Sequence, residues 1–195
     1  PLARLRLQME LISDEEVASK RVVSINEDIQ ELDDLVESLL ASARLERGVF
    51  ALNKEKILLF DICMEGLSKI DIEEREVSLQ LVKDHEILAD KILMFRVVFN
   101  LLSNIVRYTP SDSKICFGSS IDETYDHFWV SDNGKGVPEE LLPSLFDPFV
   151  RAEESRSKVT GGLGLGLMLI RQVAEAHGGY VTAQNNNGLE IHLYL

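Results

Sequence analysis

The sequence has no long apolar run, few cysteines and few basic residues, and each of these features argues against a class of protein. No stretch approaches the roughly 18 to 20 apolar residues of a membrane-spanning helix, so we expect no membrane span within the chain. The 20 Lys and Arg residues against 33 Asp and Glu residues give a net charge of −13, which argues against a nucleic-acid-binding surface. Cys63 and Cys116 lack the spacing of a metal site, so we expect reduced, buried thiols.

Two further absences concern the beginning of the chain. It has neither a starting methionine nor the basic and apolar regions of a secretory signal, so we expect a fragment of a longer protein. Its 195 residues, 45% of them apolar, suffice for one domain with a real core and one smaller element.

The first 46 residues differ in composition from the rest. They contain no glycine, and their 11 acidic against 5 basic residues carry almost half of the net charge. Their apolar residues recur at alternating steps of three and four, a heptad seam that one helix cannot bury alone. The seam consists of Val22, Ile25, Ile29, Leu32, Val36, Leu39 and Ala43.

Upstream of this seam, residues 2–12 show the same step, and Ser13 or Asp14 provides a helix N-cap. The alternation of Leu5, Leu7, Met9 and Leu11 is also compatible with a strand, but the neighbouring heptad favours a helix. We therefore expect a helical hairpin that forms a four-helix bundle with a second copy of the chain. The alternative is that the hairpin packs against the following domain.

From residue 47 onward the pattern predicts one α/β domain. Its helices and mostly antiparallel strands predict a two-layer sandwich with one layer of each. The predicted helices cover about 59–74, 91–108 (capped by Asp90) and 164–177, the last ending at Gly178-Gly179. The predicted strands cover 50–53, 77–81, 86–89, 114–119, 127–132, 180–184 and 189–194.

The first cluster with chemical potential lies on the helix predicted at 91–108. Asn100 and Asn104 are four residues apart and therefore share one face, with Arg107 one turn further. Two amide oxygens and a cation on one face suit a hydrated Mg²⁺ with a polyphosphate. Asn pairs on helices are also often merely solvated.

Three more clusters come later in the chain. Asp132-Asn-Gly134-Lys-Gly136 ends an apolar strand, which places a carboxylate at the floor of a pocket, although an ordinary Asn-Gly turn gives the same pattern. The run 146–149, Phe-Asp-Pro-Phe, indicates a buried plug beside a loop. Glycines in 161–166 open a helix, where backbone N–H groups can approach phosphates. Between them, the polar segment 151–160 has the composition of a mobile lid.

Taken in this order, the four clusters resemble the N, G1, F and G2 boxes of bacterial sensor histidine kinases of two-component systems. The resemblance covers essentially the whole chain. It implies that residues 1–46 end the dimerisation and phosphotransfer hairpin and that 47–195 form the ATP-binding domain. That domain has a Bergerat fold, an α/β sandwich with a mixed, mostly antiparallel sheet.

The opening Pro-Leu-Ala-Arg-Leu resembles the segment directly after the phosphoacceptor box, so the acceptor histidine is expected just upstream. The run 146–151 resembles the envelope-stress branch.

The resemblance also implies roles for single residues. Asp132 would accept a hydrogen bond from the adenine amino group, and Asn100 and Asn104 would hold Mg²⁺ and phosphates. Leu163 stands where the family usually has Thr or Ser, a missing hydroxyl that Thr160 would replace. The remaining nucleotide-binding positions would be Arg107, Tyr108, Gly134, Gly136, Phe149, Arg151, Gly162, Gly164, Leu165, Gly166 and Leu167. Arg151 and Arg156 would reach phosphates or be solvated or ion-paired.

The function that the resemblance implies is ATP-dependent phosphorylation of a histidine, followed by transfer to an aspartate of a response regulator. The parent protein would be a homodimer at the cytoplasmic side of the inner membrane, attached only through segments outside this chain. A hydrolytic alternative, resembling Hsp90, gyrase B and MutL, needs a Glu at the position of Asn100. The third alternative is a non-catalytic dimeric scaffold. We expect no catalytic role for His85, His127, His177 or His192.

Overall fold

Five strands form the main sheet, and two more form a separate pair. The computed structural model describes residues 52–122, 124–151 and 164–195. Its strands are β1 (Lys54–Leu58), β2 (Glu76–Gln80), β3 (Glu86–Asp90), β4 (Lys114–Ile121), β5 (Asp126–Asp132), β6 (Tyr180–Asn185) and β7 (Leu189–Tyr194). The main sheet has the order β2-β4-β5-β7-β6, in which only β2 and β4 are parallel. β1 and β3 pair antiparallel.

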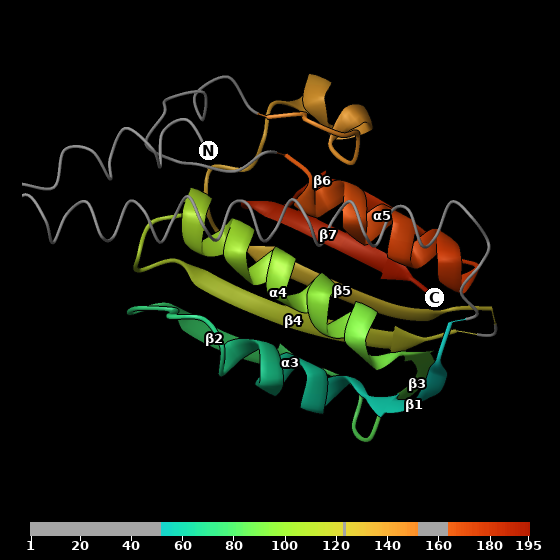
Figure 1. The fold of residues 1–195 in the computed structure, drawn as a ribbon. Coiled ribbons are helices and arrows are strands. Elements are labelled where there is room, and N and C mark those ends of the chain that lie inside the picture. Colours follow the sequence, from blue (N-terminus) through green and yellow to red (C-terminus); the bar gives the residue numbers. More distant parts are fainter. Residues whose placement is uncertain (1–51, 123, 152–163) are drawn as a thin grey trace, which may run out of the picture.

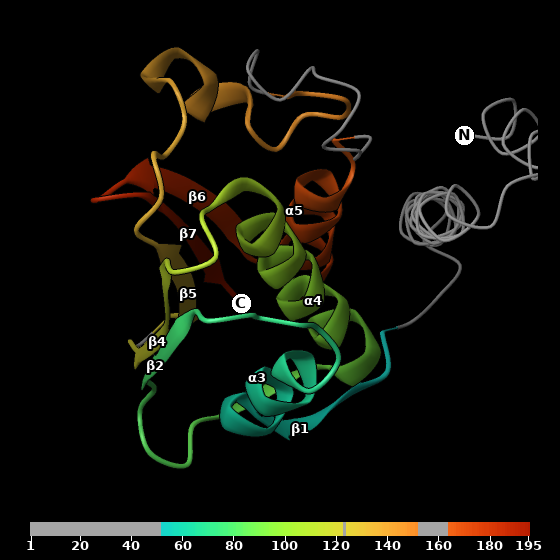
Figure 2. The same cartoon turned by 90° about the vertical axis from the view of Figure 1, so that its left-hand side faces the viewer.

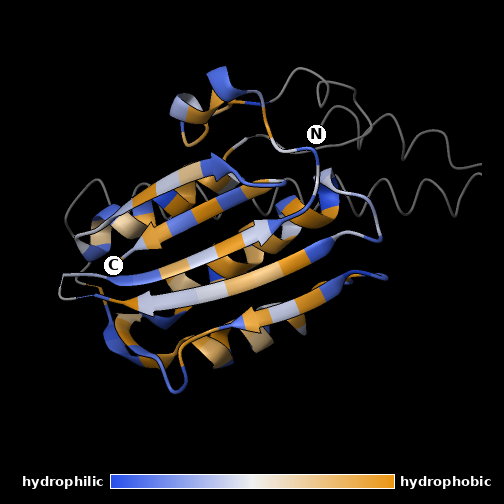
Figure 3. Ribbon diagram, turned by 180° about the vertical axis from the view of Figure 1, so that it is seen from behind, coloured by the Kyte–Doolittle hydropathy of each residue, from blue (hydrophilic) through white to orange (hydrophobic). Residues whose placement is uncertain are grey.

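The helices cover one face of this sheet (Figures 1 and 2). They are α3 (Leu59–Leu67), α4 (Lys91–Tyr108) and α5 (Gly166–His177), and a short 3-10 helix, η1, covers Glu139–Ser144. Seen from behind, the strands lie in front and no described helix covers them (Figure 3). The predicted two-layer sandwich with a mixed, mostly antiparallel sheet is therefore confirmed. Among the described residues, no helix is long and apolar enough to cross a membrane.

The central helix α4 packs between α3 and α5 and buries its apolar face in the core. Asp90 caps it, accepting hydrogen bonds from the backbone N–H groups of Ile92 (3.1 Å) and Leu93 (3.2 Å). Its apolar residues recur at helical spacing and are buried against the sheet, which is what an amphipathic sequence favours. They are Met94, Val97, Val98, Leu101, Leu102 and Ile105.

Two predicted elements are placed differently. The strand predicted at 50–53 is wrong in its described part, because the strand begins at Lys54, where pairing with β3 overrides the polarity of its first residues. The helix predicted to reach residue 74 ends at Leu67. Beyond it the Asp71 carboxylate accepts a hydrogen bond from the backbone N–H of Glu73 (2.9 Å), a local turn that competes with the helix.

The two cysteines are both free. Cys63 is buried, and burial raises the pKa of its thiol to about 12. Cys116 is only half-buried, since it alternates along β4 with the buried Ile115 and Phe117 and so faces away from the helices. The predicted hairpin, its heptad seam and the alternative strand at 5–11 lie outside the described residues.

His177, at the end of α5, joins this helix to the start of α4. Its Nε2 accepts a hydrogen bond from the backbone N–H of Asp90 (3.0 Å), and its Nδ1 lies 2.7 Å from the carbonyl oxygen of Val173. The ring is therefore neutral, with the proton on Nδ1. Burial is the main cause that lowers the pKa of His177 below its ordinary value, opposed by the hydrogen bond to Val173.

We expect the contribution of His177 to stability to decrease on acidification. The folded pKa lies below the unfolded one of about 6.5, so the unfolded chain binds the proton more readily. The contribution is complete above that pH and is lost as the pH falls through the folded pKa. Urea unfolding of the wild type and His177→Gln between pH 8 and 5 measures it, and the difference should shrink with falling pH. A constant difference would contradict this assignment.

Candidate functional site

Asn100 lies where α4 meets the beginning of α5. Its side-chain Nδ2 donates to the carbonyl oxygen of Arg96 (2.9 Å), which leaves Oδ1 as the available acceptor. Gly166, the first residue of α5, packs directly against it, since a Cβ at this glycine would lie 2.8 Å from Oδ1. The close approach explains why a glycine stands here. The absence of a side chain at Gly166 lets the start of α5 lie beside Oδ1 of Asn100, one of the amide oxygens predicted to hold Mg²⁺.

The other three site residues of α4 continue along the helix toward its C-terminal end. Asn104 is half-buried and makes no side-chain hydrogen bond to the described residues. Arg107 and Tyr108 are exposed in the last turn. A cavity of about 570 Å³ opens beside them. Its walls are Arg107, Tyr108, Thr109, Pro110, Asp112, Ser113, Asn133, Gly134 and Lys135, so two of the predicted motifs share one cavity.

Asp132 ends β5 at the base of the loop that comes next. Its Oδ1 accepts hydrogen bonds from the backbone N–H groups of Gly134 (2.7 Å) and Leu189 (3.4 Å). Burial raises the pKa of this carboxyl and outweighs the two backbone donors, which lower it. No described residue donates to Oδ2. Asp132 is therefore a half-buried carboxylate with one oxygen held by the fold and the other left for an external donor.

The loop 133–137 is held from two sides. A Cβ at Gly134 would lie 2.8 Å from Cγ2 of Thr109, so only glycine allows the loop to approach the end of α4 this closely. On the other side, Asn185 accepts from the backbone N–H of Val137 (3.0 Å) and donates to its carbonyl oxygen (2.7 Å). Gly136 packs against the same Asn185 side chain. The Asn-Gly segment is thus a wall of the cavity and more than a surface turn.

The run 146–151 meets the start of α5. Phe146 is buried, as predicted, but Phe149 is 67% exposed, because positive φ turns its side chain outward while its backbone N–H donates to the carbonyl oxygen of Gly164 (3.1 Å). The prediction of a plug made by both aromatic residues is therefore wrong for Phe149. Asp147 accepts from Arg171 of α5 (2.8 Å). These contacts hold the end of the run against the first turns of α5.

Several predicted site residues fall in or beside 152–163. Thr160, Gly162 and Leu163 lie outside the described residues, as does Arg156. Leu165 is buried and Leu167 is half-buried and packs against the core, so these two residues can offer a ligand their backbone better than their side chains. Arg151 is half-buried.

The four histidines occupy structural positions. His85 is buried, and its Nε2 lies 3.0 Å from Oδ1 of Asp126. His127 and His192 lie on β5 and β7, with 2.9 Å between Nε2 of the first and Nδ1 of the second. Burial, followed by the neighbouring His192, lowers the pKa of His127 below its ordinary value. None of the four lines the described cavity.

Sequence patterns alone do not reveal Thr109, Asn185 and Leu189, whose backbone or side chains hold Asp132 and the loop 133–137 in place. In the sequence Thr109 marks only the end of a helix, and Asn185 only part of a hairpin turn. Their roles depend on partners 25 or more positions away in the chain, which no local pattern reports.

Comparisons with known proteins agree with this geometry. A family model described as histidine kinase-, DNA gyrase B- and HSP90-like ATPase matches residues 89–195. The sensor protein RstB of Escherichia coli strain K12 is 32% identical over 95% of this chain, and the sensor protein CiaH of Streptococcus pneumoniae is 31% identical over 95%. Among solved structures, the Acinetobacter baumannii histidine kinase AdeS superimposes with a TM-score of 0.77, at 21% identity, over 100% of this chain and 94% of that one.

The fold and the cavity together define an ATP-binding domain of the Bergerat type. The chain belongs to the histidine kinase-, DNA gyrase B- and HSP90-like ATPase family, and within it the chain is similar to bacterial two-component sensor histidine kinases. It spans less than half the length of the curated relatives, 43% of RstB and 44% of CiaH.

Proposed function

We propose that this chain is the kinase core of a two-component sensor. It binds Mg·ATP and transfers the γ-phosphoryl group to a histidine, from which an aspartate of a response regulator receives it. The observation that carries the proposal is the position of Asn100, an amide whose free oxygen lies beside the start of α5. We also propose that residues 1–46 dimerise the protein, that 47–195 form the ATP-binding domain, and that the parent protein acts at the cytoplasmic face of the inner membrane.

The nucleotide base is proposed to bind at Asp132. Its Oδ2 accepts no hydrogen bond from the described residues, so it suits the exocyclic amino group of adenine, a donor. Tyr108 and residues 133–135 line the adjoining cavity and would flank the nucleoside. Arg107, at its edge, would face the phosphates. The remaining contacts are assigned to Gly134, Gly136, Phe149, Arg151, Thr160 and 162–167.

Asn100 and Asn104 of α4 suit a hydrated Mg²⁺ that is bound together with a nucleotide. No three His, Cys, Asp or Glu side chains gather as a metal site in the described residues. Mg²⁺ keeps several waters and binds through few protein oxygens together with substrate phosphates. Asn100 and Asn104 supply two amide oxygens and no fixed cage. These two residues would therefore hold Mg²⁺ only together with ATP.

Catalysis in this proposal consists of positioning and charge compensation. When bound, Mg²⁺ supplies positive charge that offsets the charge of the phosphates. Arg107 adds a cation at the same end of the site, and the backbone N–H groups that open α5 face the same phosphates. Asp132 and the loop 133–137 hold the base, so the γ-phosphate lies at a defined distance from the incoming histidine.

The identity of residue 100 favours transfer over hydrolysis. A hydrolytic member of this family needs a carboxylate there to take a proton from water. The amide of Asn100 cannot take that proton, and its Nδ2 is already bonded to the helix backbone. A histidine brought by another segment can attack the γ-phosphate without such a base, since a neutral imidazole nitrogen is itself the nucleophile.

The histidines of this chain lead to a direct test. His85 and His177 are buried, and His127 and His192 are bonded to each other on the sheet. We therefore expect that the chain binds Mg·ATP but does not label itself from γ-labelled ATP. A form extended at its N-terminus by a phosphoacceptor box should acquire label that is acid-labile and base-stable, as a phosphoramidate is.

Two results would contradict the proposal. Acid-labile label on the present chain would place the acceptor on one of its four histidines. Release of inorganic phosphate at a rate that exceeds the labelling of the extended form would favour hydrolysis. Replacement of the added histidine by Gln is the matched control, because it removes the acceptor and leaves the ATP site unchanged.

A further inference from the structure

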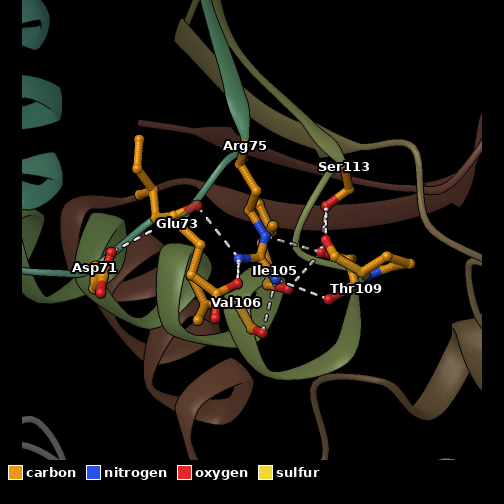
Figure 4. Close-up of polar contacts among 9 residues, drawn as sticks. Asp71, Glu73, Arg75, Ile105, Val106, Thr109 and Ser113 are labelled. Carbon is orange, nitrogen blue, oxygen red and sulfur yellow. Dashed lines mark hydrogen bonds and ion pairs between the residues drawn. The ribbon is translucent and has the colours of Figure 1, made fainter.

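Arg75, directly before β2, is a buried cation with a complete set of partners (Figure 4). Its side chain is 1% exposed. Nη2 donates to the carbonyl oxygens of Val106 (3.0 Å) and Thr109 (2.8 Å), and Nε donates to Oγ1 of Thr109 (3.4 Å). Nη1 donates to the carbonyl oxygen of Ile72 (3.4 Å) and pairs with the Glu73 carboxylate (2.5 Å).

Two of these acceptors belong to the C-terminal end of α4. The last four carbonyl groups of a helix have no partner within the helix, and a cation is favoured there by the helix dipole. Arg75 satisfies the carbonyl of Val106 and that of Thr109, the residue after the helix. A residue 31 positions before Val106 in the chain thus closes the end of α4.

The same end of α4 is a wall of the cavity. Arg107, Tyr108 and Thr109 line it, and Thr109 touches the loop at Gly134 from the opposite side. Oγ1 of Thr109 also lies 2.7 Å from Oγ of Ser113, another lining residue. Arg75 itself does not line the cavity. It lies behind the wall and holds the backbone on both sides of Arg107 and Tyr108.

We propose that Arg75 is a positioning residue for the nucleotide, which it does not touch. The planar guanidinium fixes the carbonyls of Val106 and Thr109 at once, a fork that no other side chain provides. Arg107 and Tyr108 lie between these two carbonyls, so their backbone is held at both ends against the loop 133–137. The inference rests on the proposed ATP site, because it concerns the wall of that site.

The test compares nucleotide affinity in variants that lose stability by different routes. Arg75→Met keeps an unbranched apolar stem and removes all donors, and we expect it to weaken Mg·ATP binding about tenfold in calorimetry. Arg75→Lys keeps the charge but not the planar fork, so it should bind Mg·ATP more tightly than Arg75→Met and still measurably more weakly than the wild type. Glu73→Gln removes only the half-exposed acid of the pair and should bind like the wild type.

The matched control is Ile62→Ala, which opens a cavity in the buried face of α3 away from the nucleotide site. It should lower the unfolding temperature at least as much as Arg75→Met and leave the affinity for Mg·ATP unchanged. If Arg75→Met does not fold, Arg75→Lys against Ile62→Ala gives the same comparison.

The outcomes separate this inference from the function on which it rests. A wild-type chain that does not bind Mg·ATP overturns the proposed function and this inference with it. A wild type that binds, together with an Arg75→Met or Arg75→Lys variant of equal affinity, overturns the inference alone. Equal losses of affinity in Ile62→Ala and Arg75→Met would reduce Arg75 to a stabilising residue of the fold.

Discussion

Replacing Asn104 by alanine should abolish phosphoryl transfer in the N-terminally extended form. Asn104 is half-buried on the site face of α4 and has no side-chain hydrogen bond to the described residues, so the substitution removes an oxygen that the fold itself does not need. Loss of a metal ligand leaves phosphate charge uncompensated, which corresponds to a loss of more than about 100-fold in rate. The measurement is acid-labile labelling from γ-labelled ATP at saturating Mg²⁺.

Ser103→Ala is the matched control for Asn104→Ala. It changes the neighbouring residue of the same helix, also half-buried, and should leave labelling unchanged. Both variants should unfold at nearly the wild-type temperature. Full labelling in Asn104→Ala would mean that Mg²⁺ is held elsewhere, and the assignment of this face of α4 to the metal would have to be withdrawn.

Asp132→Asn should weaken Mg·ATP binding about 10- to 100-fold, the effect of one mismatched buried polar group. The asparagine oxygen can still accept from the backbone N–H groups of Gly134 and Leu189, so the fold is kept. Its amide nitrogen then takes the place of Oδ2. Two donors, this nitrogen and the adenine amino group, would face each other.

The same geometry predicts a change in base preference. The 6-oxo group of guanine is an acceptor, so the ratio of ATP to GTP affinity should fall in Asp132→Asn. Calorimetry with both nucleotides measures it. Asp61→Asn, an equal change of charge on the exposed face of α3, serves as control. Wild-type affinity for ATP in Asp132→Asn would place the adenine elsewhere.

Predictions from the sequence succeed where a local pattern reports a burial face. The apolar spacing of α4 and the cap at Asp90 predict a helix with Asn100 and Asn104 on its other side. They fail where strand pairing or a local turn determines the bounds of an element. β1 begins with Lys54, Glu55 and Lys56, which have no apolar alternation, and it is a strand because β3 pairs with it. α3 ends at Leu67, before the predicted end at residue 74, because the turn at Asp71 competes with the helix, and the apolar spacing does not report such a turn.

The four motifs, their order and the helical register of the α4 polar face were determined by the sequence alone, because each is a property of neighbouring residues. Only the tertiary structure decided how these parts meet. The Asp132 carboxylate is oriented by the backbone of Leu189 on another strand, and the end of α4 is closed by Arg75. The physical reason is that a hydrogen bond depends on distance in space, and packing brings together residues 31 and 57 positions apart that no periodicity connects.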